Sequence, residues 1–538
     1  MALVEAAVPG AWSRPRVLVA DQLAEGGLER LREVAEVDVR TKQPEEALIE
    51  AVADADALVV RSETTVTARV LEAGQRLRVV GRAGVGVDNI DVDAATRKGI
   101  TVVNAPRGNL IAAAEHSVAL LLAVARNVPQ ADASVRRGEW QRSRFTGVEV
   151  RGKTLGVVGL GNIGSGVARR AQGLEMEVLA YDPVVTRERA DLVGCQLVSL
   201  EELFERSDFV SIHTPLVEAT RGLVGERLLR LARPTMRLVN AARGGIVDEE
   251  ALHSALSEGW IAAAAFDVFA SEPLGESPLL ELPNFIATPH IAASTVEAQS
   301  SVAADVAEEV LAVLRGETPR YAVNAPALSE EEMTFLRPFA TLTEQLAALH
   351  VQLNGPGTAR VELEYEGELA ERDVSLLTAA AVRGLLQPFT EDRINAVNAR
   401  VVAASRGLDL TERRHARSRD GFPNGVTLRV DGTQLAGTVL FGEPRVTRID
   451  AFRVDFTPAG RFLVSRHEDR PGVIGRLGSI LGELDINIAS MQVGRDAPRE
   501  HAMMIVAVDD PVPAAGVEKL RAIVGMSDLR YVDLRLPG

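Results

Sequence analysis

The sequence predicts an α/β protein with a doubly wound parallel sheet, followed by an α+β region and a small C-terminal domain. Three observations predict this architecture. Short β-branched runs alternate with helical segments from residue 16 onward, the pattern changes after residue 321, and residues 461–538 read β-α-β-β-α-β. The length of 538 residues corresponds to about three or four domains.

The first series of strands and helices has five candidate strands, at 16–20, 36–39, 57–60, 78–84 and 100–104. Segments 22–34 and 44–53 carry apolar residues at helical spacing. Strands that alternate with helices build a parallel sheet covered on both faces. The next segment, 107–128, is predicted to be one long, largely buried helix.

A second series follows, with strands expected at 154–160, 177–183, 208–215, 236–243, 262–269 and 284–290. Six strands with helical crossovers are typical of the doubly wound sheets that bind dinucleotides. A helix expected at 294–315 ends this region.

Beyond residue 321 the candidate strands are longer and more polar, at 361–367, 400–405, 426–430 and 438–442. The dipeptides Asn424-Gly425 and Asp431-Gly432 are expected to form turns between them. We therefore expect an α+β domain at 326–457. The segment 461–538, with helices expected at 472–484 and 516–524, has the ferredoxin-like order of elements.

Composition argues against several function classes. Asp and Glu total 75 and Lys and Arg 59, a formal net charge of −16, which argues against binding to nucleic acid or an anionic membrane. The single cysteine, Cys195, can form no internal disulfide or Cys-based metal centre, and the 8 histidines include no HExxH pair. From this cysteine and histidine content we expect no metal site. Residues 1–15 are expected to be flexible and lack a secretion signal, so we expect a cytoplasmic protein.

The strongest motif is Gly159-Leu160-Gly161-Asn162-Ile163-Gly164, which follows a predicted strand and opens a predicted helix. Its glycines suit a tight turn, close approach of a pyrophosphate, and helix–strand packing, in that order. The N–H groups at the start of the helix suit phosphates. Asp182 ends the next strand and is expected to bind the adenosine ribose, which favours NAD over NADP. The alternative is that the glycines serve only a turn.

Polar residues also follow later strands of this series. Arg243 ends one strand, Glu272 lies in the loop after Asp267, and His290 ends the last strand. An arginine can bind a carboxylate or carbonyl in a forked geometry, while a histidine oriented by a carboxylate can accept a hydroxyl proton. These residues predict hydride transfer at a hydroxyl-bearing carbon. The alternatives are that Arg243 forms a surface ion pair, that Glu272 is a solvated loop charge, and that His290 caps a helix.

Further arginines stand out in this acidic chain. Arg61 and Arg82 end strands of the first series. Four more cluster on one segment: Arg136, Arg137, Arg142 and Arg144. Such a cluster suits a phosphate or carboxylate ligand, or forms a solvated helix face. The basic run at 413–419 is interpreted as a surface loop, with a site for an anionic effector as the alternative.

Together these motifs resemble the D-isomer-specific 2-hydroxyacid dehydrogenase family. The resemblance rests on VRS, GRAGVGVDNID, GLGNIG, YDP, HTPL, NAARGGIVDE, DVF and TPHIAAST, and it covers residues 16–320. The additional C-terminal regions are similar to those of the long-form 3-phosphoglycerate dehydrogenase branch. The resemblance implies a Rossmann NAD-binding domain at 107–294 inserted in a flavodoxin-like substrate-binding domain at 16–106 and 295–320. It also implies an intervening domain at 326–457 and an ACT regulatory domain at 461–538.

The same resemblance implies roles for individual residues. Arg243, Glu272 and His290 would catalyse NAD-dependent oxidation of 3-phosphoglycerate, the first step of L-serine biosynthesis. The implied NAD contacts are Val85, Gly159, Gly161, Asn162, Ile163, Gly164, Asp182, Thr214, Ala241, Ala242, Arg243, Asp267, His290, Ile291, Ala292 and Ala293. The implied substrate-binding residues are Arg61, Arg82, Asn109, Arg136 and Arg142, of which the last two would reach a neighbouring subunit's site.

In the ACT-like segment, the resemblance implies an L-serine effector bound between two subunits by His467, Asp469 and Asn487. Asp469 can accept a hydrogen bond from an ammonium group, and Asn487 can both donate and accept. The alternative is that Asp469 only caps the following helix. Regulation between subunits implies a symmetric homo-oligomer, and we expect a tetramer.

Two other interpretations remain. One is another D-2-hydroxyacid dehydrogenase, such as a hydroxypyruvate or glyoxylate reductase, although these usually lack the two extra C-terminal domains. The other is a non-enzymatic NAD-sensing scaffold with the same fold.

Overall fold

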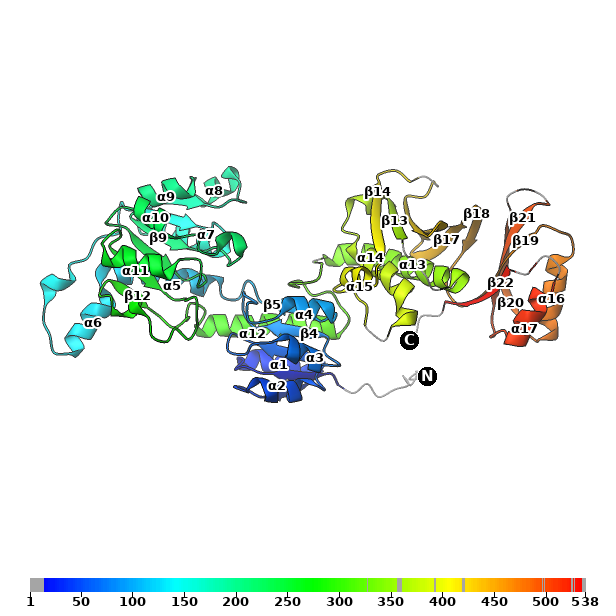
Figure 1. Cartoon of the computed structure of the whole chain (residues 1–538), viewed down its shortest axis with the longest axis horizontal. Coiled ribbons are helices and arrows are strands. Elements are labelled where there is room, and N and C mark those ends of the chain that lie inside the picture. Colours follow the sequence, from blue (N-terminus) through cyan, green and yellow to red (C-terminus); the bar gives the residue numbers. More distant parts are fainter. Residues whose placement is uncertain are drawn as a thin grey trace, which may run out of the picture.

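The structure is a computed structural model that describes residues 14–326, 328–355, 360–390, 393–418, 421–495, 497, 499–523, 526 and 528–534. Most of the N-terminal segment expected to be flexible, and the end of the basic run at 413–419, lie outside these residues. The chain folds around four sheets, which Figure 1 shows spread along the long axis of the molecule, with the second sheet in chain order at one end, followed by the first, the third and the fourth.

The first sheet has the order β2-β1-β3-β4-β5, the flavodoxin-like order, and all its pairs are parallel. Helices α2, α3 and α4 cover one face, while α1 and the distant α12 cover the other. The elements are β1 Arg16–Val19, α1 Glu25–Val34, β2 Glu36–Val39, α2 Glu45–Val52, β3 Ala57–Val60, α3 Ala68–Ala73, β4 Val79–Arg82, α4 Val92–Arg97, β5 Thr101–Asn104 and α12 Val296–Leu314. We call this set the first unit.

The second sheet has the order β12-β11-β10-β9-β6-β7-β8, also parallel throughout. This is the doubly wound order, with the change of direction between β6 and β9. Its strands are β6 Thr154–Val158, β7 Glu177–Tyr181, β8 Gln196–Leu197, β9 Phe209–Ile212, β10 Arg237–Asn240, β11 Ala263–Phe266 and β12 Phe285–Ala287. The short β8 was not expected, so the sheet has 7 strands. We call this sheet and its helices the second unit.

Helices cover both faces of the second sheet. Its helices are α5 Leu110–Arg126, α6 Val128–Arg136, η1 Arg142–Phe145, α7 Asn162–Gly173, α8 Arg187–Val193, α9 Leu200–Arg206, η2 Glu218–Thr220, α10 Glu226–Leu231, α11 Glu249–Ser257 and η3 Pro278–Glu281. The predicted long helix ends at Arg126, two residues early, because Asn127 adopts a left-handed conformation, φ 52°, and α6 starts in a new direction. Six of the helices in the first two units begin with a Thr, Asp or Ser side chain that accepts a first-turn N–H: Thr67, Asp91, Thr186, Ser199, Asp248 and Thr295.

The third unit has a sheet of order β14-β13-β15-β16-β17-β18 packed on the long helix α13 and on α14. Its elements are α13 Glu330–Asn354, β13 Arg360–Gly367, η4 Glu368–Glu371, α14 Ser375–Leu386, η5 Gln387–Phe389, α15 Ala399–Ser405, β14 Asp409–His415, β15 Asn424–Val430, β16 Thr433–Leu440, β17 Glu443–Ile449 and β18 Phe452–Phe456.

Two sequence predictions in this unit are wrong. Segment 400–405 is helix α15 and not a strand, because Ala399 and Ala403 are buried on one face at helical spacing while Val401 is 40% exposed. Asn424-Gly425 lies within β15, paired with Gly367 and Glu366 of β13. The Asp431-Gly432 turn is confirmed, since both residues have the positive φ that a two-residue hairpin requires.

The fourth unit has the order β20-β21-β19-β22, the ferredoxin-like order that the sequence predicted. Its elements are β19 Arg461–Glu468, α16 Val473–Glu483, β20 Ile488–Arg495, β21 His501–Val508, α17 Ala514–Arg521 and β22 Asp528–Asp533. One sheet face packs on α16 and α17, and the other joins the apolar core of the third unit through residues such as Phe462 and Ile505. Two hydrogen bonds of 2.8 Å between Gln352 and the Asp533 backbone strengthen this junction.

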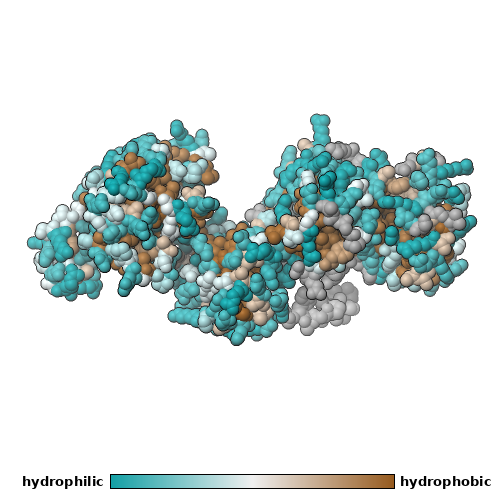
Figure 2. All heavy atoms as spheres, viewed as in Figure 1, coloured by the Kyte–Doolittle hydropathy of each residue, from teal (hydrophilic) through white to brown (hydrophobic). Residues whose placement is uncertain are grey.

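The chain leaves the first unit along its edge strand. Val323 N–H donates to Val102 O at 2.7 Å, and Asn104 N–H donates to Tyr321 O at 3.2 Å. The buried Glu309 of α12 accepts from Tyr321 N–H at 3.1 Å and from Arg320 at 3.2 Å. Figure 2 shows a broad notch above the first unit, between the second unit and the third.

Within the described part of the chain, no single helix is long and apolar enough to cross a membrane. The bent pair α5 and α6 meets that criterion only when taken together, by length and composition.

Candidate active site

The glycine-rich turn between β6 and α7 has an open side. Gly159 has φ 95°, and a Cβ there would lie 2.8 Å from His213 O. A Cβ at Gly164 would lie 2.0 Å from Gly159 O, so helix and turn pack directly on each other. A Cβ at Gly161 would meet nothing within 4 Å. The first and third glycines are therefore required by the fold, while the second leaves a space that a pyrophosphate can enter.

The residues around this turn fit a dinucleotide. Asn162 and Ile163 are the first residues of α7, whose N-cap, Gly161, makes no side-chain hydrogen bond. Asp182 follows β7 and accepts from Leu160 N–H at 2.9 Å, which fixes its carboxylate beside the turn. Thr214 follows β9, and its buried Oγ1 has no partner among the described residues. An unpaired buried hydroxyl is costly, so it supports a ligand at this position.

His290 and Glu272 form a tight pair. His290 Nδ1 lies 2.6 Å from Glu272 Oε2, and Phe269 N–H donates to Oε1 of the same carboxylate at 2.9 Å. Burial by itself would raise the pKa of Glu272, but the hydrogen bonds from His290 and Phe269 outweigh it and lower that pKa. The pair leaves Nε2 of the imidazole as the nitrogen available to a substrate hydroxyl.

Asp267 holds the loop that carries the histidine. It is fully buried and accepts from Ile291 N–H at 2.9 Å, from Ala292 N–H at 2.8 Å and from Thr288 Oγ1 at 2.5 Å. His116 Nε2 of α5 lies 3.3 Å from the same carboxylate. Burial opposes ionisation, but these hydrogen bonds hold the pKa of Asp267 below its usual range. The structure thus gives Asp267 a supporting position beneath the loop.

Arg243 follows β10 in a turn set by a buried asparagine. Asn240 accepts from Ala242 N–H at 3.1 Å and donates to Arg243 O at 3.0 Å. The guanidinium reaches the first unit, where Nε donates to Asp88 Oδ2 at 3.0 Å. Val85 lies in the same loop as Asp88, and its carbonyl accepts from the Asn104 side chain at 2.6 Å.

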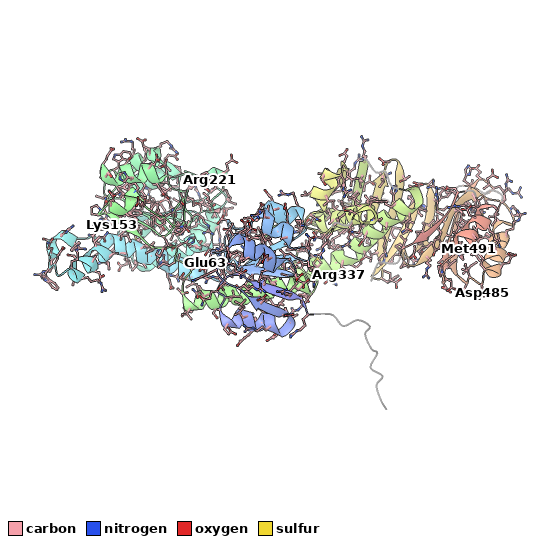
Figure 3. All side chains as sticks on the ribbon, turned by 60° about the horizontal axis from the view of Figure 1, so that its bottom comes forward. Glu63, Lys153, Arg221, Arg337, Asp485 and Met491 are labelled. Carbon is pink, nitrogen blue, oxygen red and sulfur yellow. The ribbon has the colours of Figure 1, made fainter. Side chains whose placement is uncertain are left out.

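Three arginines converge where the two units meet. Burial, followed by the positive charges of Arg243 and Arg61, lowers the pKa of Arg82 to about 10. The buried Nε of Arg82 has no partner among the described residues. Asp21 fixes the Arg61 loop, because it accepts from Arg61 N–H at 2.5 Å. Glu63 of that loop, labelled in Figure 3, marks this junction. Such a group of cations suits an anion with several charges.

The remaining predicted substrate- and cofactor-binding residues lie apart from this group of three arginines. Asn109 is at the N-terminus of α5, and its buried Oδ1 is unpartnered among the described residues. Arg136 and Arg142 are exposed on and after α6, which projects at the far end of the second unit in Figure 1. The chain therefore does not bring these two arginines to its own cluster at Arg61 and Arg82. Ala241 and Ala293 are half-buried at the carboxyl edge of the second sheet.

The effector residues also separate into two groups. His467 is buried near the end of β19, and Asp469 accepts from Arg499 N–H at 3.1 Å and from Arg495 at 3.3 Å. Asn487 precedes β20 at the opposite end of the sheet, since Ile488 and the first residue of β19 both pair with Val508. Asp485, labelled in Figure 3, marks that end. A site that uses all three residues requires two copies of the unit.

Sequence reasoning missed several residues that hold the site. Asn240, His116 and Asp21 are polar side chains on otherwise apolar strand ends or helix faces. Asn240 and Asp88 were quoted only within the motifs NAARGGIVDE and GRAGVGVDNID, and neither was assigned a role. The sequence could have indicated such residues by a polar side chain within an apolar pattern. The hydrogen-bond partner of that side chain, however, can be identified only from the fold.

Comparisons with known proteins agree with this architecture. Residues 118–292 match the family of the D-isomer specific 2-hydroxyacid dehydrogenase, NAD binding domain. Residues 335–450 match the D-3-phosphoglycerate dehydrogenase intervening domain, and residues 461–525 match the ACT domain. The fold and these matches define an NAD-binding 2-hydroxyacid dehydrogenase, so the predicted fold class and cofactor are confirmed.

Full-length relatives narrow the assignment. A D-3-phosphoglycerate dehydrogenase from Synechocystis is 46% identical over 96% of this chain and 95% of its own length. One from Methanocaldococcus jannaschii is 44% identical over 96% of this chain and 100% of its own length. The chain belongs to the D-3-phosphoglycerate dehydrogenase family.

Solved structures match more than half of this chain. The TT0316 protein from Thermus thermophilus has a TM-score of 0.54 and 37% identity, and the match covers 57% of this chain and 99% of that one. An NADPH-dependent glyoxylate/hydroxypyruvate reductase from Sinorhizobium meliloti has a TM-score of 0.53 and 30% identity, covering 58% of this chain and 97% of that one.

Proposed function

We propose that this chain oxidises 3-phospho-D-glycerate to 3-phosphonooxypyruvate with NAD, the first step of L-serine biosynthesis. The observation that carries the proposal is the 46% identity to a D-3-phosphoglycerate dehydrogenase over nearly the whole chain. The three converging arginines give this chemistry a physical basis, because the substrate carries both a phosphate and a carboxylate.

The chain's own residues divide the work of the reaction. Arg243 binds the carboxylate and carbonyl oxygens, and Arg61 and Arg82 neutralise the remaining negative charge. Nε2 of His290 accepts the hydroxyl proton, and Glu272 stabilises the imidazolium that results. NAD bound at this site would supply the hydride acceptor, so that oxidation of the substrate alcohol would give NADH, the ketone and one proton, the proton that His290 accepts. Asp182, Thr214 and the turn at Gly161 would hold the dinucleotide, and the carboxylate of Asp182 favours NAD over NADP.

A second candidate is a hydroxypyruvate or glyoxylate reductase. The Sinorhizobium meliloti reductase has a similar fold, but its match covers only 58% of this chain. The matches at 335–450 and 461–525 favour phosphoglycerate oxidation over this candidate and over a non-enzymatic scaffold.

The test is NADH oxidation with 3-phosphonooxypyruvate by the wild-type chain and by His290→Ala. We expect turnover that the substitution lowers by about 10²–10⁴-fold. Turnover of unphosphorylated hydroxypyruvate alone would favour the reductase. Binding of NADH without turnover of either acid would favour the scaffold.

We further propose L-serine as the effector and a homo-oligomer, with a tetramer as the simplest assembly. The opposite positions of Asp469 and Asn487 in one unit support a site shared by two copies. The exposed apolar residues Leu122, Val128 and Val135 on α5 and α6 support a further contact between copies. That contact would also bring Arg136 and Arg142 to a neighbouring site.

Mixed oligomers test the shared effector site. Asp469→Ala and Asn487→Ala chains should each lose inhibition by serine. Co-refolded mixtures should regain part of it, because each pair of unlike copies keeps one intact site. No recovery in a confirmed mixed oligomer would contradict a shared site.

A further inference from the structure

One ion pair joins the first unit to the second at the substrate side. Arg243 follows β10 of the second unit, and Asp88 lies in the loop after β4 of the first. Arg243 Nε donates to Asp88 Oδ2 at 3.0 Å, with the two side chains 28% and 63% exposed. An exposed ion pair of this kind contributes little to stability, so its geometry suggests another purpose.

The guanidinium is held at two of its nitrogens. Nε donates to Asp88, and Nη1 donates to Ala242 O at 2.7 Å. Among the described residues no acceptor contacts Nη2. A Cβ at Gly86 would lie 2.1 Å from Nη2 and 2.8 Å from Asp88 Oδ2, so a side chain there would displace the ends of both side chains of the pair. The planar group is therefore fixed in one orientation, with Nη2 remaining for a ligand.

Asp88 also balances the charges around Arg243. The positive charges of Arg243 and Arg61 lower the pKa of Arg82, and the negative charge of Asp88 opposes that effect. Without the carboxylate, the repulsion among the arginines would favour movement of the Arg243 side chain away from Arg82 toward solvent.

We propose that Asp88 is a positioning residue for the dehydrogenase reaction: it holds Arg243 from across the two units so that Nη2 faces the substrate. This inference rests on the proposed function. It links the approach of the two units to the assembly of the substrate site, because the second of the two contacts that orient Arg243, at Nε, forms only while the loop of Asp88 lies against it.

The test compares Asp88→Ala, Asp88→Asn and the control Glu50→Ala, which removes an exposed carboxylate from α2 of the same unit. We expect Asp88→Ala to lower kcat/KM for 3-phosphonooxypyruvate about tenfold or more, chiefly through a higher KM. The Kd for NADH should stay within about twofold, since most of the implied dinucleotide contacts lie in the second unit and the Val85 carbonyl is held by Asn104 independently of Asp88. Asp88→Asn keeps an acceptor oxygen and should recover part of the loss.

A double-mutant cycle separates positioning from a general structural effect. In an Arg243→Lys background, Asp88→Ala should change kcat/KM by less than about twofold, because lysine has no Nε in a planar fork. Equal effects in both backgrounds would overturn the proposal. An unchanged kcat/KM in Asp88→Ala would also overturn it, and an improved kcat/KM would overturn it by showing that Asp88 only repels the anionic substrate.

Failure of the proposed activity and failure of the proposed role of Asp88 give different experimental results. If the wild-type chain does not turn over the phosphorylated acid but reduces hydroxypyruvate, the proposed function fails, and the same cycle on hydroxypyruvate still decides the role of Asp88. If Asp88→Ala melts early, Asp88→Asn carries the comparison, with Tm as the check on folding.

Discussion

His290 Nδ1 and Glu272 Oε2 lie 2.6 Å apart, on the segment after β12 and in the loop after β11 of the second sheet. Glu272 is also held by Phe269 N–H, so the carboxylate is fixed from two sides. The imidazole consequently has Nδ1 bound to the carboxylate, and Nε2 is the nitrogen that the proposed mechanism uses.

Replacement of Glu272 should reduce turnover without preventing binding of the dinucleotide. We expect Glu272→Gln to lower kcat about 10–100-fold, because a neutral amide stabilises the imidazolium less than a carboxylate. Steady-state kinetics with NADH titrations measure both quantities. Glu281→Gln, an exposed carboxylate at the end of η3, is the control. A kcat within twofold of wild type for Glu272→Gln would contradict this role.

Two glycines of the dinucleotide turn should respond differently to alanine. Gly161→Ala should leave Tm unchanged and weaken NADH binding, because its Cβ enters the open space. Gly164→Ala should lower Tm as well, because its Cβ would lie 2.0 Å from Gly159 O. Thermal melting and fluorescence titration of NADH distinguish the two. Equal Tm losses in both variants would count against the open space at Gly161.

The half-buried His213 at the carboxyl end of β9 should make the second unit less stable in acid. Burial lowers the pKa of His213 to about 4, while an unfolded histidine titrates near 6.5. The unfolded chain therefore binds a proton as the pH falls from about 6.5 toward 4, while the folded chain does not, and stability decreases over that range. His213→Gln should show a smaller fall in Tm between pH 7 and pH 5 than wild type, by a few degrees. Parallel falls in Tm would refute the assignment.

The buried Glu309 should protect the linker that leaves the first unit. It accepts from Arg320 and Tyr321 N–H, so Glu309→Ala frees this segment from α12. We expect trypsin to cleave after Arg320 at least several times faster in this variant. Glu308→Ala, which removes a more exposed neighbouring carboxylate, is the matched control. Equal cleavage rates in both variants would mean that the edge strand β5 holds the linker without Glu309.

Local pattern was sufficient for much of the fold. The glycine turn, the strand ends at Arg243 and His290, and the order of the last unit depend on residues close together in sequence. The prediction of a strand at 400–405 is wrong because the structure of this segment depends on a contact with residues distant in sequence. Its β-branched residues favour a strand locally, but burial of Ala399 and Ala403 against α14 selects a helix.

The sequence by itself determined the class of fold, the cofactor and the identity of the residues expected to do the chemistry, because each is encoded in a short motif with its own backbone requirement. Only the tertiary structure decided which distant side chains meet. It paired Arg243 with Asp88 from another unit, placed His116 beside Asp267, and put Asn487 at the opposite end of its sheet from Asp469. These contacts depend on the order of the strands and on how the units pack, and the spacing of residues along the chain does not determine either.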